Sequence, residues 1–325
     1  MKRREFLTLL GGAALTGPLG ATRAAAQEYP NRAITLVVPF AAGGGNDVLA
    51  RLVADKIAKA LGREIVVDNR AGAGGIIATR AVAKARPDGY TLMLGYTGTL
   101  SINPTLYNNA GYDPRKDFAP IGLIASQSSI LCVHPSVPAK SVPELVALAK
   151  AQPGKITYGT TPGTVGHITT ELFARTAGIE LTFIPYKGTA LALNDIVAGH
   201  IQVAFAPPLT TMPHVRAGSL RALAVATAER FRLLPDVPTI AESGVPGFSA
   251  AVRYGLLAPA GTPRPIIDRL NRELQVALAA EDIRERLHRE GAEPVMSTPD
   301  DYAAEIDREE TKWGTLVRSL NLKME

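Results

Sequence analysis

The sequence predicts an α/β protein with two domains, and three observations lead to this class. The chain has 325 residues, a length that fits two domains better than one. Strand and helix patterns alternate along most of it, which predicts parallel sheets covered by helices on both faces. Two glycine-rich loops, residues 43–45 and 72–75, stand where a predicted strand gives way to a predicted helix.

Residues 1–26 have the pattern of an export signal. Lys2, Arg3 and Arg4 precede an apolar stretch from Phe6 to Leu19, and Ala24–Ala26 form a small-residue cleavage site. The Arg3-Arg4 pair fits both a twin-arginine signal and a general secretory one, so the export route stays open. We therefore expect a protein that is exported to the periplasm.

Charge and cysteine content argue against a nucleic-acid-binding protein, a disulfide-bonded protein and a lipoprotein. The signal holds four of the 35 basic and one of the 30 acidic residues, which leaves 31 and 29, a net charge of +2. No basic surface for nucleic acid is expected from that balance. The single cysteine, Cys132, lies in an apolar run and is expected to be a small buried hydrophobe. Because it is the single cysteine, no disulfide is expected, and because no cysteine lies near the cleavage site, no lipoprotein anchor is expected.

The first predicted domain begins with a strand at Ile34–Val38. Apolar residues of one helical face follow, then a strand at Ile65–Val67, a small-residue helix from Ile76 to about Ala85 and a strand at Tyr90–Leu94. The apolar face consists of Val48, Leu49, Leu52, Val53, Ile57 and Leu61. This βαβαβ order predicts a parallel arrangement of the three strands.

A second α/β series begins near Ile130. Ser141 and Glu144 have the spacing of a capping box, which predicts a helix as far as about Ala151. The remaining predicted elements are strands at Ile156–Tyr158, Thr182–Ile184 and Val203–Phe205 and a helix over Ile168–Ala177.

The C-terminal part is predicted to be helical, at Pro263–Ala280, Glu281–Glu290 and from Pro299 to about Leu320. Because such helices need a sheet to cover, we expect them to return to the first domain.

The glycine loops have two interpretations. Glycine allows tight turns between strands and helices, and it also lets backbone N–H groups at the end of a parallel sheet face an anion. Because two such loops occur in one predicted sheet, we favour a binding site for a small anion. Asp47 is expected to cap its helix and not to touch the ligand. The threonines of residues 159–167 either cap the next helix or line a polar pocket, and His167 is expected to be structural.

Motifs of enzymes and metal sites are missing from the sequence. Neither glycine loop completes G-x-G-x-x-G or G-x-x-x-x-G-K-[ST]. The histidines have no H-E-x-x-H spacing, there is no G-x-S-x-G elbow, and one cysteine makes no zinc pair. We therefore predict no catalytic residue, no metal and no cofactor.

Five segments, in order, resemble the Bug-type receptors of tripartite tricarboxylate transporters, and the likeness spans essentially the whole mature chain. They are Pro39–Asp47, Asn69–Gly75, Pro87–Leu92, Tyr186–Gly188 with Asp195, and Leu256–Pro263. The resemblance implies a periplasmic binding protein of type II, in which two α/β domains close on a small carboxylate like a Venus flytrap. It implies residues 27–126 with 253–325 as one domain and 127–252 as the other, and hinge crossings near Ser126–Ser129 and Ala250–Arg253.

The resemblance also implies a set of ligand-binding residues. From the first domain they are Phe40, Ala42, Gly43, Gly44, Gly45, Gly72, Gly74 and Gly75; from the second they are Thr160, Thr161, Gly163 and Thr164, with Asp195 near the far end of the ligand. The loop 159–167 is one residue shorter than the family pattern, which leaves open which threonine replaces which serine. Arg253 is either a cation for a second ligand carboxylate or a solvated surface charge.

The implied function is capture of a di- or tricarboxylate, an amino acid or an aromatic acid, which a monomeric receptor delivers to membrane permease subunits. A periplasmic sensor with a signalling partner is the alternative, and an enzyme on the same fold is a weaker one because no nucleophile or metal set is present.

Overall fold

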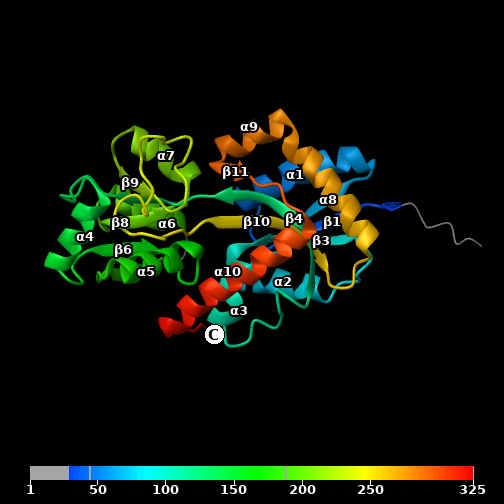
Figure 1. The fold of residues 1–325 in the computed structure, drawn as a ribbon, viewed down its shortest axis with the longest axis horizontal. Coiled ribbons are helices and arrows are strands. Elements are labelled where there is room, and N and C mark those ends of the chain that lie inside the picture. The colour runs from blue at the N-terminus through cyan, green and yellow to red at the C-terminus, as the bar shows by residue number, and fades with distance from the viewer. Residues whose placement is uncertain (1–28, 44, 187–188, 325) are drawn as a thin grey trace, which may run out of the picture.

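The computed structural model describes residues 29–43, 45–186 and 189–324. These residues form two domains, each a mixed sheet with helices on its faces, joined by two long strands that run side by side (Figure 1). The two strands are β4 (Phe118–Gln127) and β10 (Val252–Pro259). The predicted export signal lies outside the described residues. No helix within those ranges is long and apolar enough to cross a membrane.

The first sheet has six strands in the order β11-β4-β10-β3-β1-β2. Its further strands are β1 (Ile34–Val38), β2 (Ile65–Asn69), β3 (Thr91–Tyr96) and β11 (Ala292–Pro294). Strand β1 pairs in parallel with β2 and β3, which confirms the predicted βαβαβ unit. The whole sheet is mixed, because β10 returns from the second domain and pairs antiparallel with both β3 and β4.

Helices from both ends of the chain cover the first sheet. They are α1 (Gly45–Leu61), α2 (Ile76–Ala83), α8 (Arg264–Ala279), α9 (Glu281–Arg289) and α10 (Pro299–Ser319), with the short turns η1 (Ala73–Gly75), η2 (Gly98–Ile102) and α3 (Asn103–Leu106). The predicted apolar face of α1 is buried at Leu49, Val53 and Ile57. Helices α8 and α10 pack against β4.

Glycines on two neighbouring central strands make room for a tyrosine of α10. Gly255 of β10 pairs with Gly95 of β3. A Cβ atom at Gly255 would lie 2.2 Å from Cζ of Tyr302, and one at Gly95 would lie 3.1 Å from the Tyr302 hydroxyl. Tyr302 is only 2% exposed. The two glycines therefore form a notch that seats α10 on the sheet.

The second sheet has five strands in the order β7-β6-β8-β5-β9. They are β5 (Ile130–Val133), β6 (Thr157–Thr160), β7 (Thr182–Pro185), β8 (Val203–Ala206) and β9 (Arg221–Val225). The helices are α4 (Val142–Ala151), α5 (Val165–Ala177), α6 (Thr189–Val197) and α7 (Pro208–Arg216). Cys132 is fully buried in β5, and burial raises its pKa to about 12, so the thiol is unreactive.

One predicted capping detail and one predicted helix start differ from the structure. Ser141 accepts the N–H of Glu144 at 3.3 Å, but the Glu144 carboxylate accepts the N–H of Lys140 at 2.8 Å, so only half of the predicted capping box forms. Helix α5 begins at Val165, ahead of the predicted Ile168, because Thr164 caps it by accepting the N–H of His167.

Candidate functional site

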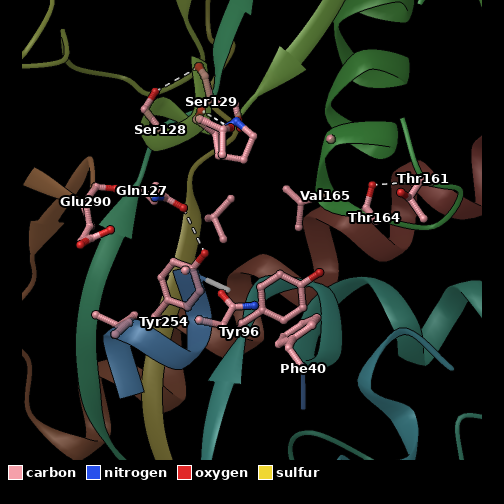
Figure 2. Close-up of a pocket in the computed structure, with 18 of the residues that line it drawn as sticks. Phe40, Tyr96, Gln127, Ser128, Ser129, Thr161, Thr164, Val165, Tyr254 and Glu290 are labelled. Carbon is pink, nitrogen blue, oxygen red and sulfur yellow. Dashed lines mark hydrogen bonds between the residues drawn. The ribbon is translucent and has the colours of Figure 1, made fainter. Parts of the chain in front are cut away.

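A cleft of about 750 Å³ is lined by residues of both domains and of the strands that join them (Figure 2). One side comes from the loop after β1 and the start of α1, and the opposite side comes from the loop after β6 and the start of α5. Ser128 and Ser129 between β4 and β5, and Val252 and Tyr254 of β10, complete it. A small molecule in this cleft would contact both domains and both connections.

The loop after β1 is held in place by a polar network outside the cleft. The Asp47 carboxylate, which is buried, accepts the N–H of Gly43 at 2.9 Å, and Arg51 Nε lies 2.9 Å from the same carboxylate. Asn69 Nδ2 donates to the carbonyl of Phe40 at 3.1 Å, and Arg51 also donates to Asn69. Asp47 thus holds the loop at Gly43 without lining the cleft. It does so from the first turn of α1, as the third residue of that helix, and not from the predicted capping position ahead of it.

Replacing Asp47 with asparagine is expected to destabilise the protein in a pH-dependent way. The hydrogen bond from Arg51 and then the N–H of Gly43 hold the pKa of Asp47 below its ordinary value of 3.8, against the opposing effect of burial. A carboxylate with a lowered folded pKa stabilises above its unfolded pKa, and this contribution is lost as the pH falls through the folded pKa.

Urea unfolding of both proteins at pH 7 and at pH 3 tests this prediction. The wild type should exceed the variant in free energy of unfolding by about 1.5–3 kcal/mol at pH 7, the size of a hydrogen bond to a charged group. The difference should shrink at pH 3. An equal difference at both pH values would contradict the role of the Asp47 charge.

Threonine hydroxyls line the side of the cleft that the second domain provides. Thr164 donates to the carbonyl of Thr161 at 2.7 Å and lies 3.3 Å from the hydroxyl of Thr160. Thr161 Oγ1 is buried and has no hydrogen-bond partner among the described residues. A buried hydroxyl without a partner costs free energy. Because the Thr161 oxygen is also covered on the cleft side, a ligand would reach it only after the Thr161 side chain turns toward the cleft.

Three aromatic rings, those of Phe40, Tyr96 and Tyr254, lie together on one side of the cleft (Figure 2). Phe40 meets Tyr96 edge to face at 5.0 Å between ring centroids, and Tyr96 stacks on Tyr254 at 6.2 Å. The Tyr254 hydroxyl donates to Gln127 Oε1 at 3.1 Å, and Gln127 Nε2 donates to the backbone carbonyl of Glu290 at 3.0 Å. Burial raises the pKa of both tyrosines, so each phenol stays neutral.

The N-terminal ends of three helices converge on the cleft. Gly45 and Asn46 begin α1, and Val165 and Gly166 begin α5. Helix α7 follows Pro207 and opens with Pro208, so it contributes its dipole but lacks the first two N–H donors. N–H groups of a first helical turn have no carbonyl partner within the helix, and the helix dipole makes that end positive. Glu290 is the only charged residue among the described residues that line the cleft. The cleft can therefore hold an anionic group through backbone donors and an apolar body against the rings.

The structure places part of the predicted ligand-binding set in this cleft. The residues that line it are Phe40, Ala42, Gly43, Gly45, Thr160, Thr161 and Thr164. Gly44 lies outside the described residues. The binding role of these residues stays a prediction, and the structure adds that the Gly43 N–H is already bonded to Asp47.

The second glycine loop and Gly163 pack against other parts of the protein. A Cβ atom at Gly74, where φ is +61°, would lie 3.1 Å from the Tyr107 hydroxyl. The Gly74 carbonyl accepts from Asn103 Nδ2 at 2.9 Å. A Cβ atom at Gly163 would lie 2.6 Å from Sδ of Met324. The described lining of the cleft does not include Gly72, Gly74, Gly75 or Gly163. A valine at Gly74 would therefore strain the backbone and lower stability, whether or not the loop also binds a ligand.

Asp195 and Arg253 also lie away from the described lining of the cleft. Asp195 accepts from the Tyr186 hydroxyl at 2.5 Å. Arg253 Nε lies 3.0 Å from Glu305 on α10. The His167 ring is buried, stacks on Phe183 and accepts the N–H of Gly163, which fits a structural role.

Several cleft residues were not predicted from the sequence. They are Tyr96, Gln127, Ser128, Ser129, Gly166, Thr210, Tyr254 and Glu290. A signal for Tyr254 was present, because side chains alternate along a strand. Val252 and Tyr254 therefore share the face that lines the cleft, and Arg253 takes the opposite face, toward Glu305. No group of three or more His, Cys, Asp or Glu residues that could hold a metal occurs within the described residues.

Comparisons with known protein families and with solved structures identify the same group of relatives. Residues 49–322 match the family described as "Tripartite tricarboxylate transporter family receptor", TctC. The solved R. palustris protein Rpa4515 with adipate is 38% identical, with a TM-score of 0.81 over 91% of this chain and 100% of that one. The periplasmic binding protein BugD is 36% identical, with a TM-score of 0.78 over 91% and 100%. MatC from Rhodopseudomonas palustris with bound malate is 34% identical, with a TM-score of 0.78 over 89% and 100%.

The family match spans more than half of the chain and agrees with the predicted resemblance and fold. The family is one of transport receptors, which agrees with the prediction that the protein is not an enzyme. The chain belongs to the TctC, or Bug-type, family of tripartite tricarboxylate transporter receptors and has the two-domain fold of periplasmic binding proteins.

Proposed function

We propose that this protein is a periplasmic receptor that captures a small organic carboxylate and delivers it to the membrane permease of a tripartite transporter. The observation that carries the proposal is the convergence of three helix N-termini on one cleft whose described lining has no basic side chain. Such a site binds an anion through N–H groups and leaves it chemically unchanged. Relatives solved with adipate and with malate support the ligand class.

A thermal-shift screen of the mature protein against mono-, di- and tricarboxylates tests the ligand class. A ligand at about 100 times its dissociation constant stabilises by about 2.7 kcal/mol, which corresponds to a rise in melting temperature of roughly 4–5 °C in a protein of this size. Mass spectrometry of the recovered ligand should show the unaltered acid. A chemically changed ligand, or no shift with any carboxylate, would overturn the proposal.

Hinge closure at the two connecting strands is expected to accompany binding. Gln127 at the end of β4 pairs with Val252 at the start of β10, so the covalent connections between the domains lie side by side. Only non-covalent contacts cross elsewhere, such as Arg232 to His288 Nδ1 at 3.2 Å and Arg175 to the Ser319 carbonyl at 3.3 Å. A ligand that touches both domains would favour the closed arrangement.

Small-angle scattering of an Arg175→Ala, Arg232→Ala double variant tests closure. Without these contacts the ligand-free protein should have a larger radius of gyration than the wild type, and saturating carboxylate should reduce it. A radius that stays constant in the variant, despite binding shown by calorimetry, would argue against hinge motion.

A further inference from the structure

The cleft continues into a smaller compartment inside the second domain, called here the side chamber. Its volume is about 140 Å³, and Thr160, Phe205, Pro207 and Thr210 line both spaces. Helix α6 and strands β6 and β8 provide the rest of its lining. Since the two spaces share these residues, a ligand in the cleft can extend a substituent into the chamber.

The described lining of the side chamber is mostly apolar, and its one amide side chain, Asn194, belongs to an exposed residue. Ala192, Ile196 and Ala204 are buried in it and belong to the core of the second domain. The two hydroxyls at its mouth are already engaged, because Thr160 contacts the Thr164 hydroxyl and Thr210 donates to the Pro207 carbonyl. No charged residue is among the described residues that line it. Water there finds few partners, and apolar cavities favour apolar occupants.

The size of the chamber depends on small side chains. Alanines of α6 and β8 face it at positions 190, 192, 204 and 206. At the ~30 Å³ that one water molecule takes up in the liquid, 140 Å³ is room for roughly four to five groups of methylene size. A larger side chain at any of these alanines would reduce that room.

We propose that the side chamber binds the apolar arm of the ligand and so selects carboxylates that carry an alkyl or aryl substituent. The inference rests on the proposed function, since it places the carboxylate at the helix N-termini of the cleft. A second carboxylate in the chamber would lose its hydration without gaining a charged partner there, so the chamber disfavours it. The proposal therefore narrows the ligand to a carboxylate whose far end is apolar.

Calorimetry with butyrate, hexanoate and octanoate tests the arm. Each methylene that enters the chamber should improve affinity about fourfold in the wild type. The variant Ala192→Leu should weaken octanoate by about tenfold or more and leave butyrate within about twofold. Ala198→Leu, the same change at an exposed position just after α6 and outside the chamber lining, is the matched control and should leave both acids unchanged.

The outcomes separate the inference from the proposed function. The proposed role of the side chamber is overturned if the wild type binds the three acids equally, or if Ala192→Leu weakens butyrate and octanoate equally. Either result leaves the proposal of carboxylate binding intact. No binding of any carboxylate overturns both. If Ala192→Leu does not fold, Ala190→Leu at the exposed end of the chamber replaces it, with the same expected loss confined to octanoate.

Discussion

Replacing Gly166 with valine is expected to weaken carboxylate binding by about 100-fold while the protein stays folded. Gly166 lines the cleft in the first turn of α5. A Cβ atom there would lie 3.2 Å from Thr160 Oγ1 and 3.3 Å from the Phe205 carbonyl, which narrows the approach to the helix N-terminus. Each lost hydrogen bond to a charged group costs about 1.5–3 kcal/mol, or about 10- to 100-fold in affinity.

Calorimetry and urea unfolding of a graded series measure this effect. Gly166→Ala should give an intermediate loss of affinity, because alanine adds only the Cβ atom. Stability should fall somewhat in Gly166→Val, because the added side chain must pack against the Phe205 carbonyl. Urea unfolding therefore checks that each variant is folded before its affinity is compared. Ala177→Val in the last turn of α5, outside the cleft lining, is the control and should bind normally. Normal binding by Gly166→Val would mean that the ligand does not use this helix end.

The largest expected loss of stability comes from Gly255→Val in the central strand β10. The added side chain would fall within the ring of Tyr302, where a Cβ atom already lies 2.2 Å from Cζ. Overpacking a core costs about 1–3 kcal/mol and sometimes more. In a chain of this length the melting temperature should fall by slightly less than about 2 °C per kcal/mol. We expect a loss of at least about 3 kcal/mol.

A double-mutant cycle with Tyr302→Leu separates the notch from a general loss of strand stability. Leucine lacks the ring atoms that meet the new side chain, so it should recover part of the loss in Gly255→Val. Both single variants and the double variant are compared by urea unfolding at one pH. Additive losses would show that the notch is not the cause.

Local patterns predicted the elements whose physical cause is local. Helix α1 and strand β1 lie where their apolar patterns predicted them, because the residues that form the buried face of each element are close together in the sequence. The glycine loop at residues 43–45 was predicted as a strand-to-helix connection because it lies between these two elements. The antiparallel pairing of β10 with β3 and β4 could not be predicted in this way, since it joins residues 125–164 positions apart in the sequence.

The same distinction applies to the candidate site. Thr160, Thr161 and Thr164 stood out because hydroxyls cluster just before a helix. Tyr96, Gln127 and Tyr254 meet only through the pairing of three strands, and nothing near them in the sequence marks them as neighbours. The side chamber could not be predicted from the sequence either, because it too depends on contacts between separate elements. Alanines are common in helices and strands, and only their shared orientation leaves a space between α6 and β8.

The position of β10 in the first sheet has a consequence for the order in which the chain folds. Strand β10 lies between β3 and β4, but in the chain it follows the whole second sheet. All five strands of the second sheet lie within residues 130–225, so its pairing can be complete before β10 is synthesised. Until then β3 and β4 have open edges, which are prone to pairing with other chains. A nascent chain is thus expected to complete its second domain first, and its first domain is the one that chaperones must protect.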